Sequence, residues 1–315
     1  MKTARNLILH VFIGIFAVLT LIPFAFALNN SFRTNHEIYH AFFGMPASFH
    51  GIIESGRLVL QGKEDTTVAF LDEDGETVQM PAGEALREHW DTATRGYTLG
   101  WEILRTYLLN TLFVVVCVAL GTVLSASIAA YILSRYKFPG HRALFYYMIA
   151  AMMFPGVLTF VPSFMVVRHL GLLNTYWVMI LPYIAGGQVI ATYIFKSFFD
   201  GLPEDLFESA RIDGAGHLQL YGNIVLPLSK PVVSVVIIMS IFGAWNNFIW
   251  PFVTLMDGDL HPIASGLYVM ATSQYAQNFS TLFSAYMVSS IPLLLLFIYA
   301  TKPFIEGVTS GAFKA

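Results

Sequence analysis

Six long apolar stretches constrain the fold of this chain more than any other feature of its sequence. A helix needs about 20 residues to cross a hydrocarbon core of about 30 Å, and it satisfies all of its own backbone groups there. The stretches meet this length with few charged residues, which predicts an all-α polytopic membrane protein with six transmembrane helices. They cover residues 7–28, 107–133, 143–167, 176–195, 232–255 and 283–301.

Composition and charge agree with this prediction and give it an orientation. Hydrophobic residues make up 56% of the chain and charged residues 12%, whereas a soluble domain carries about 25% charged residues. Lysine and arginine collect before the first stretch, in the connections 134–142 and 196–231, and after the last stretch. The short connections on the other side carry only Arg168. Because cytoplasmic loops are rich in lysine and arginine, we expect both termini in the cytoplasm (N-in, C-in).

The first 28 residues also have the features of a secretory signal. Lys2 and Arg5 precede the apolar run, and Ala25-Phe26-Ala27 has the small-residue pattern of a cleavage site. The run is longer than a signal core of about 7–15 residues. We therefore expect residues 1–28 to remain as an N-terminal transmembrane helix.

Residues 29–106 form a long polar insert between the first two stretches. The insert holds 12 acidic and 6 basic residues, hence a net charge of −6, in a chain whose total is −3. Strand-like runs occur at 57–61, 67–71 and 76–80 with a turn signal between the last two, and 83–90 has a helical pattern. These features predict a small, β-rich extracytoplasmic element near the lower size limit for an independent core. A flexible acidic loop is the alternative.

A hydrophilic turn at residues 201–227 separates the fourth and fifth stretches. Its first residues, Gly-Leu-Pro-Glu-Asp, end the preceding stretch and start a helix, because proline fixes φ and acidic side chains favour a helix N-terminus. Leu206, Phe207 and Ala210 would share one face of this helix, and two glycines further along would end it. The pattern predicts a short, bent element on the cytoplasmic side.

The spacing within this turn resembles the E-A-A loop of the membrane subunits of ATP-binding-cassette importers. Glu208-Ser209-Ala210 is followed after three residues by Gly214, and after nine more by Ile224-x-Leu226-Pro227. The resemblance implies that the turn, here called the coupling loop, docks in an ATPase subunit, where the glutamate meets a basic residue. Serine stands where the family usually has alanine, and it is small enough to preserve docking. A chance amphipathic turn is the alternative. The residues assigned to ATPase coupling are Leu206, Phe207, Glu208, Ser209, Ala210, Asp213 and Gly214.

Two further segments resemble the carbohydrate permeases of this class. Residues 244–252 are similar to their W-N-x-F-x-W-P segment, and residues 306–315 to their E-G-x-x-x-G-A-x-K-G terminus, with Ala315 in place of the last glycine. The resemblance spans residues 106–315. It implies a non-catalytic permease subunit of a binding-protein-dependent sugar importer in a bacterial or archaeal cytoplasmic (inner) membrane. The implied partners are a second, homologous permease subunit in a heterodimer, two copies of an ATP-binding subunit, an extracytoplasmic solute-binding protein and a sugar.

The predicted organisation therefore has four parts. They are a transmembrane helix at 1–28, the insert at 29–106, a permease core at 107–301 that includes the coupling loop 201–227, and a cytoplasmic tail at 302–315. We expect the tail to lie against the ATPase dimer with an irregular backbone, which Gly307 and Gly311 would permit. A frayed terminus is the alternative.

Polar and aromatic side chains within the predicted helices are candidates for the solute pathway. Amides in a membrane are costly unless they are hydrogen-bonded, so they should face the interior of the bundle or a watery cavity. A tryptophan ring could stack on a sugar. These side chains could equally hold helices together. The candidates are Trp245, Asn246, Asn247, Tyr183, Gln188 and Tyr193.

The connection 257–281 is predicted to lie outside the membrane and is rich in adaptable polar groups. In related importers a loop at this position reaches the binding protein, which the resemblance implies here as well. The candidate contacts are Tyr268, Ser273, Gln274, Tyr275 and Gln277.

Other functions lack the residues that they need. The chain has no phosphate-binding G-x-x-x-x-G-K-[ST] motif, so ATP is expected on a separate subunit. An ion-coupled transporter needs ionisable groups inside its helices, and an enzyme needs convergent catalytic groups; neither stands out. Cys117 is the single cysteine, and His36 and His40 have no third ligand, so we expect no metal or other cofactor. No feature indicates nucleic acid. An importer of a non-sugar solute is the main alternative, followed by an ion-coupled transporter.

Overall fold

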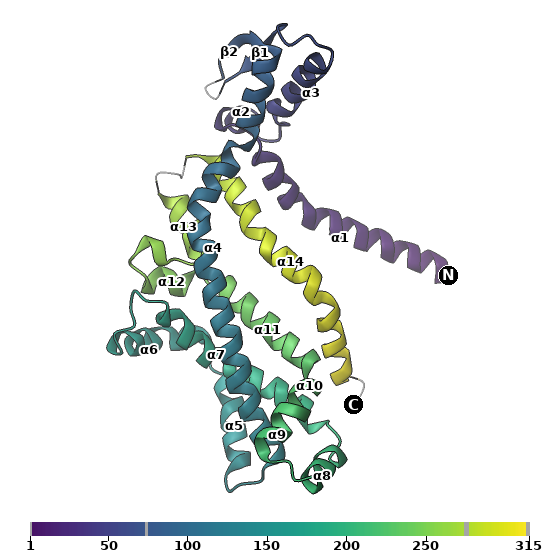
Figure 1. Cartoon of the computed structure of the whole chain (residues 1–315), viewed down its shortest axis with the longest axis vertical. Helices are drawn as coiled ribbons and strands as arrows, with labels where there is room; N and C mark the ends of the chain where they lie inside the picture. Colours follow the sequence, from purple (N-terminus) through teal and green to yellow (C-terminus); the bar gives the residue numbers. More distant parts are fainter. Residues whose placement is uncertain (1, 73–74, 274–276, 313–315) are drawn as a thin grey trace. The chain divides into compact units, whose positions relative to one another are not determined.

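The computed structural model describes residues 2–72, 75–273 and 277–312. Most of them are helical (Figure 1), and the chain divides into two compact units. The insert unit contains Met1–Arg105 and Leu267–Pro292, and the core unit contains Thr106–Gly266 and Leu293–Ala315. The long helices α4 (Ala82–Arg135) and α14 (Phe279–Ala312) contribute to both units.

The insert unit combines helices with one hairpin. It begins with α1 (Lys2–Asn30) and continues through α2 (Asn35–His40) and α3 (Ala47–Leu60). Strands β1 (Thr67–Leu71) and β2 (Thr77–Pro81) then pair antiparallel, from Thr67 opposite Pro81 to Leu71 opposite Thr77. Most of α13 (Ile263–Thr272) also belongs to this unit. Two of the three strand-like runs thus form strands.

The strand predicted at 57–61 is wrong, because these residues are the end of α3 and its C-cap. Ser48 and Ser55, seven positions apart on α3, are both buried, as expected for residues on one helical face. Gly51 lies between them, and a Cβ there would be 2.1 Å from His89 Nε2 in α4. Small residues therefore let α3 pack closely against α4, which outweighs the local strand-like pattern. The described insert is mainly helical and not β-rich.

Helices run through two of the predicted boundaries. The boundary predicted at residue 106 lies where the two units divide, after Arg105, but α4 continues through it as a single helix of 54 residues, which corresponds to about 80 Å. Similarly, α14 continues to Ala312. Residues 302–312 are thus helical where an irregular backbone was expected, and residues 313–315 lie outside the described residues.

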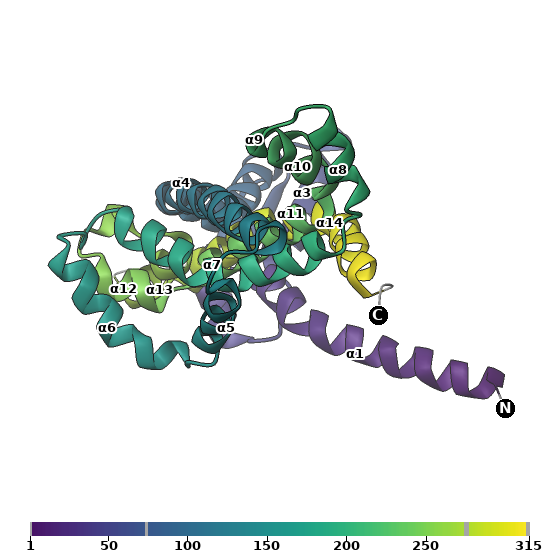
Figure 2. The same cartoon turned by 90° about the horizontal axis from the view of Figure 1, so that it is seen from below.

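The core unit consists of the second part of α4 and a series of shorter helices. These are α5 (His141–Met152), α6 (Gly156–His169), α7 (Trp177–Asp200), α8 (Asp205–Ile212), α9 (His217–Leu220), α10 (Leu226–Leu228), α11 (Lys230–Trp245) and α12 (Ile249–Thr254). A π-helical turn over Tyr221–Val225 joins α9 to α10, and a 3-10 turn over Gly258–Leu260 follows α12. Figure 2 shows α8, α9 and α10 grouped together beside α11.

A buried apolar cluster forms where α4, α7, α8 and α11 meet. Alanines on α4 and α7 allow these helices to approach, and phenylalanine rings fill the space between them. The cluster contains Ala126, Ala130, Tyr131, Ala191, Phe195, Phe199, Phe207, Leu220, Val225, Val232 and Val236. The coupling loop contributes three of these residues, so it is packed onto the core unit.

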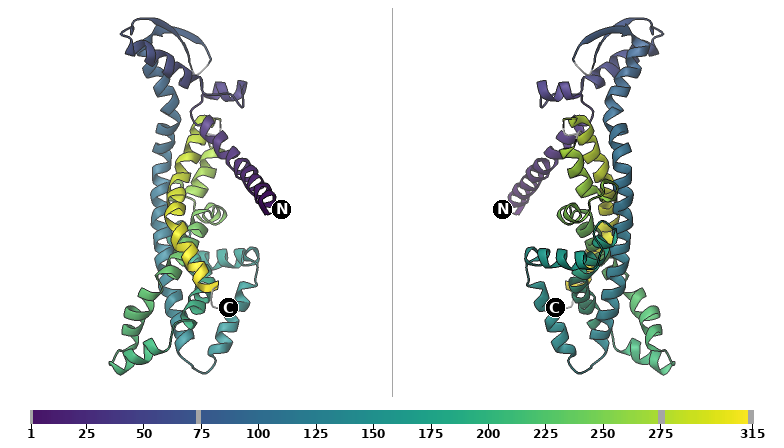
Figure 3. Two further views of the ribbon diagram at one scale, coloured as in Figure 1. Left: turned by 90° about the vertical axis from the view of Figure 1, so that its right-hand side faces the viewer. Right: turned by 90° about the vertical axis from the view of Figure 1, so that its left-hand side faces the viewer.

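Within the described residues, four helices are long and apolar enough to cross a membrane, and the number rises to six if two bent pairs each count as one span. The predicted segment 143–167 corresponds to α5 and α6, which meet at 103° (Figure 3). Pro155 lies in this break and cannot continue a helix. The second bent pair is formed by residues 217–228 and α11, which meet at 79°. The predicted segment 232–255 corresponds to α11 and α12, which are separated by a break at 246–248. The chain is a multi-pass membrane protein, and the count of six crossings stays a prediction.

Candidate functional site

The coupling loop, residues 201–227, lies between α7 and α11 and contains α8, α9 and α10. On α8, Phe207 is fully buried and Ala210 is half-buried, whereas Leu206 is 41% exposed. The buried face of α8 therefore includes Phe207 and Ala210 but not Leu206, and it is narrower than the face that the spacing of these three residues predicted. The other predicted coupling residues are exposed: Glu208, Ser209, Asp213 and Gly214.

Gly214 forms the turn that ends α8. Its φ is +84°, in the left-handed region that other L-residues rarely adopt. Its N–H donates to Arg211 O at 3.0 Å, and Ala215 N–H donates to Ala210 O at 2.9 Å, as in helices that end with a left-handed residue. A Cβ at Gly214 would meet no atom within 4 Å. The backbone conformation, and not close packing, therefore requires glycine.

The coupling loop exposes two large apolar side chains. Ile212, at the end of α8, and Leu218, in α9, are each 86% exposed. The exposed carboxylates Glu208 and Asp213 lie in the same part of the chain. Large exposed apolar groups among polar ones are typical of interaction sites. The loop thus leaves two large apolar and two acidic side chains exposed.

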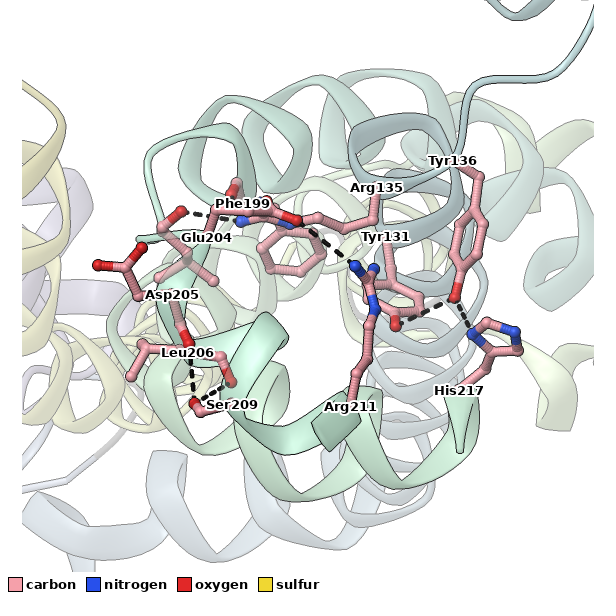
Figure 4. A network of polar contacts seen from close by, with 11 residues as sticks. Tyr131, Arg135, Tyr136, Phe199, Glu204, Asp205, Leu206, Ser209, Arg211 and His217 are labelled. Carbon is pink, nitrogen blue, oxygen red and sulfur yellow. Dashed lines mark hydrogen bonds and ion pairs between the residues drawn. The ribbon is translucent and has the colours of Figure 1, made fainter. Parts of the chain in front are cut away.

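Arg135, the last residue of α4, is the centre of the polar contacts that hold the coupling loop (Figure 4). Its side chain is 7% exposed, and its Nη1 lies 2.6 Å from Glu204 Oε2. Its Nη2 donates to the carbonyls of Phe199 at 2.5 Å and Leu202 at 3.1 Å. The guanidinium carbon lies 4.0 Å from the centroid of the Phe207 ring. One side chain thus contacts the end of α7, the turn after it and α8.

The two neighbours of this arginine also contact distant parts of the chain. Ser134 Oγ donates to Asp200 Oδ1 at 2.6 Å, and Lys196 Nζ lies 2.6 Å from Asp200 Oδ2. Tyr136 OH is hydrogen-bonded to His217 Nδ1 in α9. The last two residues of α4 and the residue after it therefore contact the end of α7 and the starts of α8 and α9. The sequence pattern marks the arginine only as a cytoplasmic charge and does not reveal these contacts.

A cavity of about 320 Å³ lies among α6, α7 and α12. Two of the predicted pathway candidates, Tyr183 and Asn247, line it together. Trp250, also in the lining, donates its backbone N–H to Asn247 Oδ1 at 3.2 Å and its Nε1–H to Val178 O at 2.7 Å. The Phe160 and Trp250 rings meet edge to face, with centroids 5.4 Å apart. Polar lining residues that the sequence analysis did not single out are Thr159 and Ser163.

The other pathway candidates do not line this cavity. Trp245 is only 5% exposed and packs within the protein. Asn246 uses its Nδ2–H to bond Phe242 O at 3.0 Å, one turn back on its own helix. Gln188 is half-buried, and Tyr193 is 48% exposed with its ring parallel to that of Phe145. A packing role therefore fits Trp245, whereas Tyr183 and Asn247 fit a lining role.

A protein family described as "binding-protein-dependent transport system inner membrane component" matches residues 121–304, which is more than half of the chain. The chain belongs to this family. The match includes the whole coupling loop and all lining residues of the cavity, and it excludes the insert.

Individual permeases of transport systems are also similar to this chain in sequence. A diacetylchitobiose uptake permease from Streptomyces coelicolor is 33% identical over 243 residues, covering 76% of this chain and 79% of that protein. An arabinooligosaccharide permease from Halalkalibacterium halodurans is 32% identical and covers 66% of this chain and 74% of that protein. A sn-glycerol-3-phosphate permease from Shigella flexneri is 28% identical and covers 65% of this chain and 72% of that protein.

A solved structure shows that the fold is shared as well. A chain from the crystal structure of a bacterial importer of the acidic polysaccharide alginate superposes with a TM-score of 0.68 at 19% identity, covering 94% of this chain and 95% of that chain. The protein is thus a permease subunit of the binding-protein-dependent transport family, and it shares the fold of this solved chain. Such permeases are non-catalytic membrane subunits that work with a solute-binding protein and an ATPase.

The connection after α12 holds the residues predicted to contact the binding protein in this transport family. Tyr268 lies on α13 and is 43% exposed. Ser273 and Gln277 are exposed, and Ser273 Oγ donates to Met270 O at 2.9 Å. Gln274 and Tyr275 lie outside the described residues.

Proposed function

We propose that this chain forms half of the translocation pathway of an ATP-driven oligosaccharide importer in the cytoplasmic membrane. A second, different permease subunit would form the other half, two ATP-binding subunits would drive transport, and a binding protein would deliver the solute from outside. The coupling loop carries this proposal, because it is anchored to α4 by Arg135 and leaves Glu208, Ile212 and Leu218 exposed. The oligosaccharides named for the relatives support the solute class.

The coupling loop docks in the ATPase subunit through α8 and α9. Glu208 bonds a basic residue there, a charge-assisted contact that contributes about 1.5–3 kcal/mol. Ile212 and Leu218 bury their apolar side chains against the same subunit. When the ATPase subunits close on ATP, they move the loop, and the core helices exchange an inward-open for an outward-open pathway.

The cavity among α6, α7 and α12 contributes to the solute pathway on this side. Aromatic rings can stack on the C–H face of a sugar, while the hydroxyls of Thr159, Ser163 and Tyr183 and the amide of Asn247 can bond its hydroxyls. None of its lining residues is charged. This chemistry suits a neutral sugar ring.

A phosphorylated solute is the second candidate, since a relative transports sn-glycerol 3-phosphate by name. A phosphate needs cationic partners. None of the residues that line the cavity is lysine, arginine or histidine, so the partner permease would have to supply the charge. The same lining offers no ionisable group for ion-coupled transport other than the Tyr183 phenol. The neutral sugar is therefore favoured.

The connection between α12 and α14 contacts the binding protein. The exposed side chains of Tyr268, Ser273 and Gln277 combine an aromatic ring with hydrogen-bonding groups, which suits a protein interface. A cysteine at Ser273 or Gln277 should cross-link to the binding protein and should be labelled only from outside the membrane.

Reconstitution into proteoliposomes with the partner subunits tests the proposal. ATP-dependent uptake is measured with labelled diacetylchitobiose, with a panel of other neutral oligosaccharides and with sn-glycerol 3-phosphate. We expect uptake of a neutral oligosaccharide that requires both ATP and the binding protein. Uptake of the phosphate alone would favour the second candidate.

A matched pair of variants tests the docking contact. Glu208→Gln should lower both co-purification of the ATPase subunit and uptake, whereas Asp205→Asn, also exposed and in the first turn of α8, should change neither. Equal behaviour of the two variants would remove Glu208 from the coupling role.

A further inference from the structure

We infer that Arg135 is a positioning residue that fixes the coupling loop to the end of α4, so that movement of the loop is passed to that helix. The inference rests on the proposed function, because it concerns how the docked loop is joined to the membrane helices. Neither the E-A-A spacing nor the family match assigns a role to this side chain.

Arg135 joins segments that are far apart in the sequence. Its hydrogen-bond acceptors on Phe199, Leu202 and Glu204 lie 64, 67 and 69 positions away. The guanidinium is planar and holds its donors in a fixed fork. A displacement of α8 that preserved these hydrogen bonds would therefore carry the end of α4 with it. Lysine, with one flexible ammonium group, could not keep the same set of contacts.

Two of the acceptors of Arg135 are carbonyls at and just after the end of α7, and the carbonyl of Phe199 also accepts from Leu202 N–H at 3.1 Å. The carbonyl of Phe199 belongs to the last turn of α7, and that of Leu202 to the turn after it; carbonyls at a helix end have no partner within the helix. A cation there also matches the negative end of the α7 dipole. One cation thus fixes the end of α7 and the start of α8 against the end of α4.

The face of the guanidinium makes a further contact with α8. It lies over the ring of Phe207, which is fully buried, and stacking of this kind is favourable for arginine. Arg135 thus makes two contacts with α8. One is with the carboxylate of Glu204, just before the first turn of α8, and the other is with the ring of Phe207 within α8. Two different contacts to one helix restrict its rotation as well as its distance.

A second arginine shows why burial matters here. Arg211 Nη1 lies 3.7 Å from the other oxygen of Glu204, and the two side chains are 44% and 51% exposed. An exposed pair of this kind contributes little. The Arg135 pair is shorter, at 2.6 Å, and the arginine side chain is 7% exposed. Glu204 is therefore held by α4 more firmly than by its own helix.

The main test measures transport per ATP in the assembled complex. With Arg135→Gln, we expect the ATPase subunit to remain bound and ATP hydrolysis to continue, while the ratio of solute uptake to ATP hydrolysed falls about tenfold. Arg135→Lys should give an intermediate ratio. Arg142→Gln removes an exposed cation from α5 in the same cytoplasmic region and should leave the ratio unchanged. A purely structural role would lower uptake and hydrolysis in proportion, and an unchanged ratio in Arg135→Gln would overturn the inference.

Glu204 provides an independent check of the same contact. Glu204→Gln should lower the ratio in the same direction, and the double variant Arg135→Gln/Glu204→Gln should be no worse than the single arginine variant. If the effects of the two substitutions on the ratio were fully additive in the double variant, the two side chains would not act through one contact.

Hydrogen exchange separates this inference from the proposed function. In the full chain purified alone in detergent, Arg135→Gln should raise amide exchange across residues 205–220, a measurement that needs neither ATPase nor solute. Raised exchange together with no uptake by the wild-type complex would support the positioning role and contradict the importer. Unchanged exchange would contradict the positioning role even if uptake were normal.

Discussion

Arg33 in the insert unit and Arg135 in the core unit are both buried guanidinium groups, but they connect different kinds of partner. Arg33 is 1% exposed and donates to Asn30 Oδ1 and to the carbonyls of residues 37, 41 and 42, all within nine positions. The hydrogen-bond acceptors of Arg135 lie 64 to 69 positions away. The first arginine closes a local loop, and the second joins separate helices. Loss of the first should therefore affect stability, and loss of the second should affect coupling.

The largest effect is expected on the apolar side of the Arg135 contact. Phe207→Ala empties a fully buried site in the core cluster and should lower the free energy of unfolding by about 3–5 kcal/mol. Leu206→Ala, at the 41% exposed neighbour, should cost about 1 kcal/mol. Thermal unfolding of the purified chain in detergent measures both. Equal losses of unfolding free energy in the two variants would mean that the Phe207 ring does not help to hold the coupling loop on the core unit.

Removal of the local arginine should destabilise the insert alone. Arg33→Gln removes the guanidinium that is shared by Asn30 Oδ1 and the carbonyls of residues 37, 41 and 42, and it should cost about 3 kcal/mol. Hydrogen exchange should rise in residues 30–60 and stay unchanged in residues 205–220. Arg57→Gln, at an exposed position on α3, is the control and should change neither. Raised exchange in the coupling loop would remove the contrast between the two arginines.

The backbone of the coupling loop gives the next effect. Gly214→Val forces a β-branched residue to a φ of +84° and should cost about 1–3 kcal/mol, with reduced coupling of uptake to ATP hydrolysis. Gly216→Val is the matched control, because Gly216 has φ −75° and ψ 169°, which valine adopts readily. Normal uptake and hydrolysis by Gly214→Val would show that the turn does not transmit movement.

The cavity contrasts with both arginine sites because no charged residue lines it. Tyr183→Phe removes one hydroxyl from the lining and should raise the half-saturating solute concentration about fivefold, as expected for one lost hydrogen bond of about 1 kcal/mol. Tyr193→Phe, on the same helix but outside the lining, should leave it unchanged. The reverse result would place the pathway on the other face of α7.

The smallest effect concerns the pH dependence of the insert. Burial lowers the pKa of His89, and the nearby Glu54 raises it in part. The unfolded chain then binds a proton at His89 more readily, with a pKa of about 6.5. The stability that neutral His89 contributes is thus complete above about pH 6.5 and declines as the pH falls through that value. This contribution is measured from the unfolding temperatures of the wild type and of His89→Phe between pH 7.5 and 5.5. The unfolding temperature of the variant should fall less on acidification than that of the wild type.

Local patterns predicted the helices and the coupling loop well, because apolar length and the spacing of Glu208, Ala210 and Gly214 are properties of neighbouring residues. The same reasoning failed where packing across the fold decides. The strand expected at 57–61 is helical because His89 packs on Gly51 of α3. The contacts of Arg135 could not be predicted, because no single-sequence pattern links residues 69 positions apart.

The solute pathway shows the same limit. The sequence identified Tyr183 and Asn247 by residue type, but it gave Trp245 equal weight, and that side chain is buried. Trp250 lies five positions further along, beyond the break at 246–248, and lines the cavity. A break of this kind alters which side chains share a face, and helical periodicity does not predict it.

Cross-linking of the coupling loop tests the central claim most directly. Cysteine replaces Ile212, which is 86% exposed on α8, or Tyr147, which is 75% exposed on α5, after the single native cysteine, Cys117, has been changed to serine. In the reconstituted complex, the Ile212 position should cross-link to the ATPase subunit and the cross-link should stop ATP-driven uptake, while the Tyr147 position should do neither. A cross-link absent at Ile212, or one that leaves uptake at the normal rate, would contradict the account.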